Sequence, residues 1–422
     1  MIQWNGLMVF FLTVFVASLL VHGVLNGLNL RHLRRHGDEI PEVLRGEIDG
    51  ETLTKISRYT LDSQRFGTAA GLFDDALTLA VLLSGLLPWL IDRLPAWEEH
   101  FLLAGLLFFG LLGIASGLIG LPFDLYRTFV IEKRHGFSTI TLRLWMIDLL
   151  KGIAVSSVLM GLLLSALLTL LRFAPLSWWF WTWLVFASFQ LLMIWLYPVV
   201  IAPLFNRYEP IRDEGLREVV IALMAKVGLK TEGVYQMDAA KRSRHTNAYF
   251  TGLGRTKRIV LFDTLLASHT AEEITAVLAH EIGHWKRRHI LKQLLFMEVA
   301  SLVVLWLASH LIAWPLLYET FGFTRPIPFV GLLLCAALVG PLTILITPVV
   351  SAAQRRFERE ADTCVFSLTG RTSPLMSALK RLARDNLANL HPHPLYARFY
   401  YSHPPLTERI ARLEEFESKN GP

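Results

Sequence analysis

Two histidines with a glutamate between them form the most informative pattern in this chain. They stand in the run His280-Glu281-Ile282-Gly283-His284. Residues four apart on an α-helix lie one turn apart on the same face, so both imidazoles can converge on one zinc ion. A carboxylate beside the first histidine is placed to accept a proton from a water at that metal. The spacing therefore predicts the zinc centre of a metalloprotease.

A catalytic zinc usually has three protein ligands, so a third is needed. Glu358 is the candidate, in the segment Phe-Glu-Arg-Glu-Ala-Asp at 357–362. Asp362 follows one helical turn later on the same face, where it can hold a ligating imidazole. We expect Glu360 to point elsewhere and to be solvated. The alternative for Glu358 is an ordinary charged residue on a polar helix surface.

The segment that carries the histidines, 270–289, has the pattern of an amphipathic helix. Thr270 and Glu273 form a capping box at its start, and apolar residues recur behind them at helical spacing. Three short runs upstream have the composition of strands: 234–237, 248–251 and 258–263. A strand at a sheet edge can bind an extended peptide through main-chain hydrogen bonds. We expect this helix and a small β-sheet to carry the chemistry.

Composition places these elements in a membrane protein. The 422 residues are 53% hydrophobic and 18% charged, whereas a typical soluble domain is about 25% charged. This excludes a disordered chain and argues against an ordinary soluble globule. The formal charge of +6 does not indicate nucleic-acid binding, because no polar segment carries a stripe of basic and aromatic residues. Cys335 and Cys364 lack a C-x-x-C pattern, so we expect neither a disulfide framework nor a zinc–thiolate site.

Seven apolar runs are long enough to cross a bilayer, which takes roughly 20 residues each. They are 7–30, 69–90, 101–121, 144–171, 176–205, 290–317 and 329–353. Lys and Arg are concentrated in the loops after the first and third runs. The positive-inside rule then places the N-terminus outside and both large polar segments, 206–289 and 354–422, in the cytosol. Because both lie on one side, they can form a single domain.

The expected fold is therefore a mainly α-helical polytopic membrane protein. About seven transmembrane helices would carry a cytosolic, gluzincin-like zinc metalloprotease domain with a small β-sheet. We expect residues 1–205 to hold five spans, 206–289 the HExxH helix, 290–353 two further spans, and 354–422 the remainder of the protease domain with the third ligand. Asp74, Asp75, Asp148, Lys151 and Gln190 fall within the apolar runs. They either line a water-filled interior or lie at the membrane interface.

The sequence resembles the type I CAAX prenyl proteases, which are integral-membrane zinc metalloendopeptidases. The resemblance covers most of the chain and depends on six blocks in the family's order. These are FVIEKRHGF at 129–137, IAPLFNRYEP at 201–210, NAYFTG at 247–252, HEIGHW at 280–285, RRFEREAD at 355–362 and SHPPLTERI at 402–410. The family removes the C-terminal tripeptide that follows a prenylated cysteine, and its spans enclose a large intramembrane chamber.

The resemblance implies a role for each matching residue around the metal. His280, His284 and Glu358 would bind one zinc ion per chain. Glu281 would be the general base, and Asp362 would support a ligand from behind.

Three further positions match the family near the substrate. Asn247 would help to hold the substrate backbone from an edge strand above the metal. His403 and Arg409 would assist substrate binding and stabilise the oxyanion of the transition state. Without the resemblance, we would interpret Asn247 as a turn or cap residue and His403 as a turn residue before Pro404 and Pro405.

Two other functions compete with CAAX processing. An HtpX-like quality-control peptidase has the same HExxH chemistry but fewer spans. Charged residues within the spans would suit a transporter or receptor with a catalytically inactive protease fold. Such a protein would more often have lost a site residue, whereas here the proposed zinc ligands and base are all present. A site-2-type intramembrane protease is disfavoured, because Lys286, Arg287 and Arg288 follow the motif directly.

The expected partners are a peptide or protein substrate, either prenylated or unmodified, and the lipid bilayer, with no nucleic acid. We expect a multi-pass protein of the bacterial inner membrane, with the endoplasmic reticulum membrane as the alternative.

Overall fold

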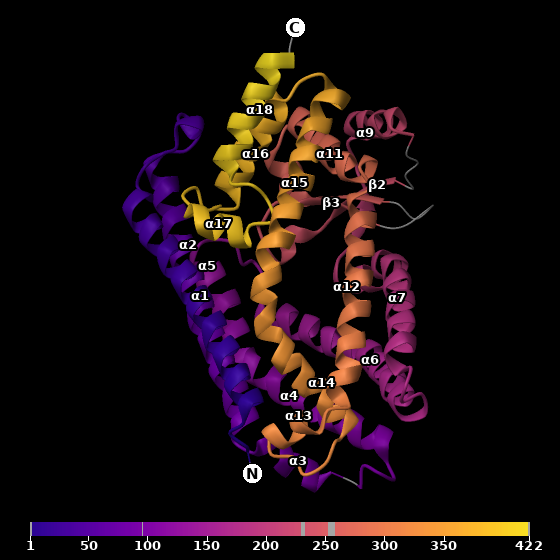
Figure 1. The fold of residues 1–422 in the computed structure, drawn as a ribbon. Helices are drawn as coiled ribbons and strands as arrows, with labels where there is room; N and C mark the ends of the chain where they lie inside the picture. Colours follow the sequence, from indigo (N-terminus) through magenta and orange to yellow (C-terminus); the bar gives the residue numbers. More distant parts are fainter. Residues whose placement is uncertain (1, 95, 229–232, 252–257, 421–422) are drawn as a thin grey trace.

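The computed structural model describes residues 2–94, 96–228, 233–251 and 258–420, and this part is mainly helical (Figure 1). Seven helical segments among the described residues are long and apolar enough to cross a membrane, which confirms the predicted number of spans. Their helices are α1 (Gly6–His36), α2 (Gly50–Leu83), α4 (Phe101–Tyr126), α6 (Leu142–Phe173), α7 (Trp178–Leu196), α12 (His289–Ile312), α14 (Pro328–Val339) and α15 (Thr343–Thr369).

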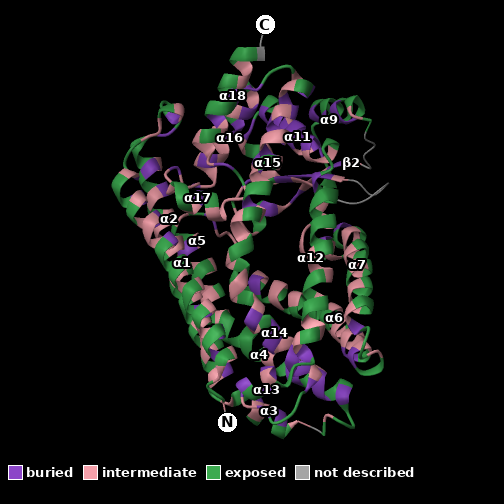
Figure 2. Cartoon of the chain, in the orientation of Figure 1, coloured by how far each residue is buried: buried purple, intermediate pink, exposed green. Residues whose placement is uncertain are grey.

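Buried residues gather at the two ends of the molecule, and the long helices between them are mostly exposed (Figure 2). One apolar cluster, with Phe11, Phe108 and Phe329 among its members, lies at the end that holds the N-terminus. In α4, residues 113–120 are exposed without exception, so little of this stretch is covered by neighbouring helices.

The last span does not stop where its apolar run ends. A single turn (Gly340–Leu342) joins α14 to α15. Helix α15 then passes the predicted end of the span at residue 353 and continues to Thr369. Gly370 ends it in the left-handed conformation, with φ of +79°. The proposed third ligand, Glu358, is therefore held rigidly on the same helix that leaves the apolar segment.

Four longer helices lie outside the candidate membrane spans, and one of them is the predicted catalytic segment itself. They are α9 (Glu214–Lys226), α11 (Ala271–Lys286), α16 (Ser373–Asp385) and α18 (Leu406–Asn420). The short helices are α3 (Leu86–Arg93), α5 (Glu132–Arg134), α8 (Ala202–Phe205), α10 (Asp263–Ser268), α13 (Pro315–Thr320) and α17 (Pro394–Tyr400). Leu278 and Ile282 of α11 pack with Ile259, Leu261 and Val365 in the second apolar core.

A four-stranded mixed sheet lies beside α11. Its strands are β1 (Tyr208–Pro210), β2 (Gly233–Met237), β3 (Ala248–Thr251) and β4 (Arg258–Phe262), in the order β1-β2-β4-β3. Strands β2 and β4 are parallel, and the outer strands pair antiparallel. The three predicted strands are confirmed to within one residue, and β1 was not predicted. Strand β3 lies at a sheet edge, as a peptide-binding strand must.

Polar residues of the long helices connect them to other elements. Arg242, just before β3, donates from Nε and Nη2 to the two carboxylate oxygens of Asp148 on α6, over 2.8 and 3.1 Å. Lys151 donates to the Leu204 carbonyl, and Gln190 donates to Glu298 on α12. For Asp148 and Lys151 these contacts favour the interface alternative over a water-filled interior.

Candidate active site

Helix α11 begins at the predicted capping box. The Thr270 hydroxyl accepts from the Glu273 main-chain N–H, and Glu273 Oε2 accepts from the Thr270 N–H over 2.8 Å. The Glu273 carboxylate is 3% exposed, and it also accepts from the Ser377 hydroxyl and from Arg381. This residue therefore starts the helix and joins it to α16, which fixes the position of the histidines two turns later.

Gly283 lets α11 and α15 approach each other closely. A Cβ atom at this position would lie 3.0 Å from the Ala361 Cα and carbonyl oxygen and 3.0 Å from the Cys364 Cβ. Contacts this short are tighter than nine in ten of those that real Cβ atoms make. The glycine inside the HEIGH motif thus allows the two helices to bring His280 and Glu358 together.

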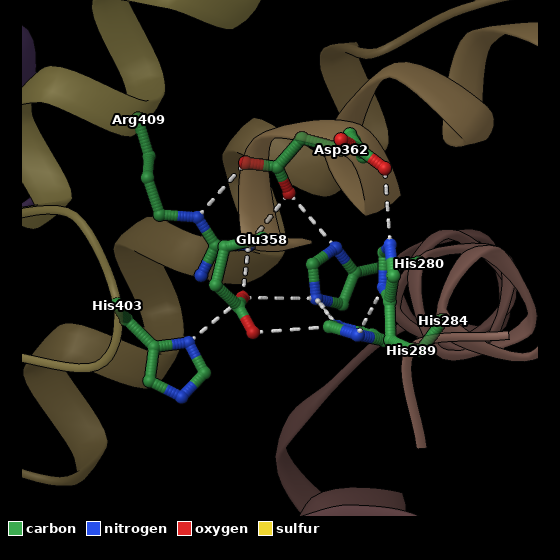
Figure 3. A network of polar contacts seen from close by, with 8 residues as sticks. His280, His284, His289, Glu358, Asp362, His403 and Arg409 are labelled. Carbon is green, nitrogen blue, oxygen red and sulfur yellow. Dashed lines mark hydrogen bonds and ion pairs between the residues drawn. The ribbon is translucent and has the colours of Figure 1, made fainter. Parts of the chain in front are cut away.

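Three potential ligand atoms converge between these helices (Figure 3). The Nε2 atoms of His280 and His284 are 3.2 Å apart. Glu358 Oε2 lies 3.3 Å from His280 Nε2, and Glu358 Oε1 lies 3.3 Å from His284 Nε2. Two ligands at ~2.0–2.1 Å from a tetrahedral zinc ion are about 3.3 Å apart. The nitrogen and oxygen donors and their separations thus fit a zinc ion.

A carboxylate and a guanidinium lie behind His280. Asp362 Oδ1 is 2.8 Å from His280 Nδ1, the ring nitrogen that faces away from the other ligands. Arg409, on α18, donates from Nε and Nη2 to the two oxygens of Asp362, over 3.0 and 2.6 Å. The Arg409 side chain is 10% exposed. Its bidentate bond fixes the carboxylate that orients the imidazole.

The charges of this group favour a cation between the ligands. Burial of the imidazole lowers the pKa of His280, but Asp362 and Glu358 outweigh this effect and raise it to about 9. Burial also lowers the pKa of Arg409, and the charges of Asp362, Glu358 and Glu281 raise it above its usual value. Glu281 is therefore close enough to this group to act on it electrostatically.

His284 has a support that differs from that of His280. Its Nδ1 lies 3.1 Å from Nδ1 of His289, and His289 Nε2 lies 3.2 Å from Glu360 Oε2. The His289 ring is 1% exposed and stacks on Phe357 with a centroid distance of 4.3 Å. Glu360 is 28% exposed and stays outside the ligand group, but it contacts His289, so the expectation that it takes no part in the site is wrong. Sequence reasoning also missed His289, because it lies beyond the end of α11.

The remaining predicted residues lie at different distances from this centre. His403 is exposed, and its Nδ1 is 2.8 Å from Glu358 Oε2, so it stands at the open side of the group. Asn247 directly precedes edge strand β3, and its side-chain oxygen accepts from the Ala248 N–H. Asn247 is exposed and takes no part in the polar network of Figure 3. Strand β3 nonetheless approaches α11, where Phe250 and Trp285 have centroids 6.4 Å apart.

Comparisons with known proteins find similarity over most of the chain. A family model described as "CAAX prenyl protease N-terminal, five membrane helices" matches residues 29–207, and "Peptidase family M48" matches residues 210–417. CAAX prenyl protease 1 of Saccharomyces cerevisiae is 33% identical over 407 residues, which cover 90% of each protein. The Homo sapiens CAAX prenyl protease 1 homolog is 31% identical over 91% of this chain and 90% of its own length. The crystal structure of S. mikatae Ste24p matches with a TM-score of 0.89 and 31% identity, covering 98% of this chain and 100% of that one.

Proposed function

The chain belongs to the CAAX prenyl protease family of M48 peptidases, and on that premise we propose that it cleaves prenylated proteins next to their lipid-bearing cysteine. It is a protease with several membrane spans. The proposal depends above all on one observation, the convergence of His280, His284 and Glu358 at separations of 3.2–3.3 Å. These three side chains would hold one zinc ion.

A zinc ion held there would polarise the scissile carbonyl and lower the pKa of a nearby water. Glu281 would take a proton from that water and deliver it to the leaving amine. It follows His280 directly on the helix and is partly exposed, so its carboxylate is accessible to water. Asp362 and His289 would keep the two imidazoles in the orientation that presents Nε2 to the ion.

His403 is better placed than Arg409 to stabilise the developing oxyanion. The His403 ring is exposed beside Glu358, whereas Nε and Nη2 of Arg409 donate to Asp362. We propose that His403 donates to the oxyanion and that Arg409 acts by holding Asp362. The family resemblance alone did not separate these two roles.

The substrate would lie along the free edge of β3. An extended peptide can add to this edge through main-chain hydrogen bonds, with Asn247 at the start of the strand. A prenyl chain needs an apolar environment next to the site. The exposed faces of residues 113–120 and of the other long helices would supply it.

The competing functions receive less support. The relatives compared are CAAX prenyl proteases over 90% of the chain, which disfavours an HtpX-like peptidase. A transporter or receptor without protease activity would not need to keep a complete set of zinc ligands. We propose that the site faces the cytosol, in agreement with the distribution of basic loops. Residence in a bacterial inner membrane, with the endoplasmic reticulum as the alternative, stays a prediction.

The test compares cleavage of one C-terminal CAAX peptide with and without its farnesyl group, using full-length protein in detergent. The Glu281→Ala variant is the matched control. Cleavage that requires the farnesyl group and is lost in the variant supports the proposal. Equal cleavage of both peptides would indicate a broader membrane peptidase, and activity that survives in Glu281→Ala would contradict the mechanism.

A further inference from the structure

A second polar pocket, of about 740 Å³, lies beside α15 and outside the catalytic group. Residues of α15, α17 and the start of α18 line it, and the end of α1 contributes His32. None of His280, His284, Glu358 or Asp362 lines this pocket. Figure 1 shows α17 between α15 and the pair α1 and α2, so the pocket lies on the side of α15 that faces the first spans.

Cations outnumber anions in this pocket. Arg355, Arg359 and Arg398 line it, and Glu408 is the carboxylate among its lining residues. Arg359 donates to Glu408 over 2.7 Å, which balances one positive charge. Arg355 donates to the carbonyl oxygens of Ala397 and Tyr401, which are neutral acceptors and leave its charge uncompensated. The exposed Arg398 adds another positive charge at the rim.

These guanidiniums also keep hydrogen-bonding capacity. The Nε atom of Arg359 is buried and has no hydrogen-bond partner among the described residues. Arg355 and Arg359 are one helical turn apart on α15 and line the same pocket, so their two guanidinium groups share one side of the helix. The imidazole of His32 adds a further polar group, whereas His391 already donates from Nε2 to the Glu39 carbonyl oxygen over 2.6 Å. Convergent guanidiniums with an excess of positive charge match the geometry of a phosphate group.

The position along the helices indicates where such a phosphate comes from. Helix α15 changes from apolar to basic residues between Val350 and Arg355, and Ala352 lines the pocket at this transition. Helix α1 changes in the same way before Arg34 and Arg35, beside His32. Such transitions lie at the level of the lipid head groups, where basic residues attract anionic lipids.

We propose that this pocket binds the phosphate head group of an anionic phospholipid. Pro405 and Thr407 line the same pocket, and they lie in the short segment between His403 and Arg409. A bound head group would therefore contact the chain that carries two residues of the catalytic group. The lipid site does not require the proposed substrate to be correct, since none of the residues that line it is a proposed zinc ligand.

The experiment measures binding of dioctanoyl phosphatidic acid to the purified full-length protein by native mass spectrometry. Dioctanoyl phosphatidylcholine and inorganic phosphate serve as comparison probes. We expect saturable binding of phosphatidic acid and binding of phosphatidylcholine that is about tenfold weaker, because its choline cancels the phosphate charge. Arg398→Glu should weaken the binding of phosphatidic acid about tenfold or more. Glu408→Gln should strengthen it a few-fold, because it frees Arg359 from its competing carboxylate.

The matched control is Arg212→Glu, which makes the same charge change at a side chain that is 82% exposed and distant from the pocket in sequence. It should leave lipid binding unchanged. Equal affinity in Arg398→Glu and Arg212→Glu would overturn the site, as would weaker binding in Glu408→Gln. Binding of inorganic phosphate as tight as that of the lipid would overturn the assignment to a phospholipid. Melting temperatures of the variants verify that each is folded.

Discussion

The Nδ1 atoms of His284 and His289 lie 3.1 Å apart, and this contact fixes the proton positions of both rings. Two imidazole nitrogens can share one proton only if one donates and the other accepts. When His284 Nε2 is a metal ligand, its Nδ1 carries the proton and donates to His289. His289 must then carry its own proton on Nε2, which faces Glu360 Oε2 at 3.2 Å. Glu360 thus orients a ligand through an intermediate histidine.

Replacing Glu360 should weaken the zinc site without altering its ligands. In Glu360→Ala, His289 loses the acceptor that fixes its tautomer, and we expect zinc affinity to fall about tenfold. Competition with a chelator measures this affinity independently of turnover. Arg356→Ala is the matched control, since it removes the other partner of Glu360 but leaves the bond to His289 in place. Equal zinc affinity in the two variants would contradict the role of Glu360.

Removing the third ligand should have a larger effect on metal content. Glu358→Ala leaves two imidazoles and removes the carboxylate that lies 3.3 Å from each of them. We expect the purified variant to contain less than about a tenth of the zinc of the parent protein. Elemental analysis measures this directly. Glu281→Ala is the control, and it should keep its zinc and lose turnover. Full zinc content in Glu358→Ala would exclude Glu358 as a ligand.

Gly283→Ala should destabilise the domain by separating α11 from α15. Its Cβ would stand 3.0 Å from the main chain of Ala361, which cannot move independently of its helix. Overpacking of this kind costs about 1–3 kcal/mol, and we expect a lower melting temperature. The control is Gly152→Ala on α6, where a Cβ would have nothing within 4 Å. If both variants melt alike, the close approach of the helices does not depend on this glycine.

Local patterns in the sequence were sufficient for much of this architecture. The seven spans follow from the length of apolar runs, and the capping box at Thr270 and Glu273 follows from two residues three apart. The separation of Glu358 and Asp362 placed both on one helix face, and both do face the histidines. Each of these features lies within one element, where a single periodicity decides the geometry.

The errors concern residues whose environment is formed by two elements. Glu360 meets His289 only because the chain turns at Arg288, which has φ of +56°, and starts α12 with His289 in contact with His284. No helical periodicity extends across that turn. The predicted end of the last span at residue 353 marked a change in polarity, but α15 continues because a helix ends where its backbone turns, here at Gly370.

The stability of α11 should depend on pH through Glu273. Burial raises the pKa of this carboxyl, but hydrogen bonds from Ser377 and Thr270, with the charge of Arg381, outweigh burial and lower it below the usual value. A carboxyl whose pKa is lowered on folding stabilises the protein above its unfolded pKa. That contribution disappears as the pH falls through the folded pKa. Glu273→Gln should therefore cost about 1–3 kcal/mol near pH 7 and progressively less in acid below the unfolded pKa.

Melting temperatures of the detergent-purified protein from pH 7 down to pH 3 measure this dependence. Glu272→Gln is the matched control, because Glu272 lies in the same first turn of α11 but is 67% exposed. We expect the gap between the parent protein and Glu273→Gln to narrow in acid, and Glu272→Gln to follow the parent throughout. A gap that stays constant with pH would mean that Glu273 acts through its shape and not its charge. The capping box would then owe its stabilisation to hydrogen bonds that a neutral amide can also form.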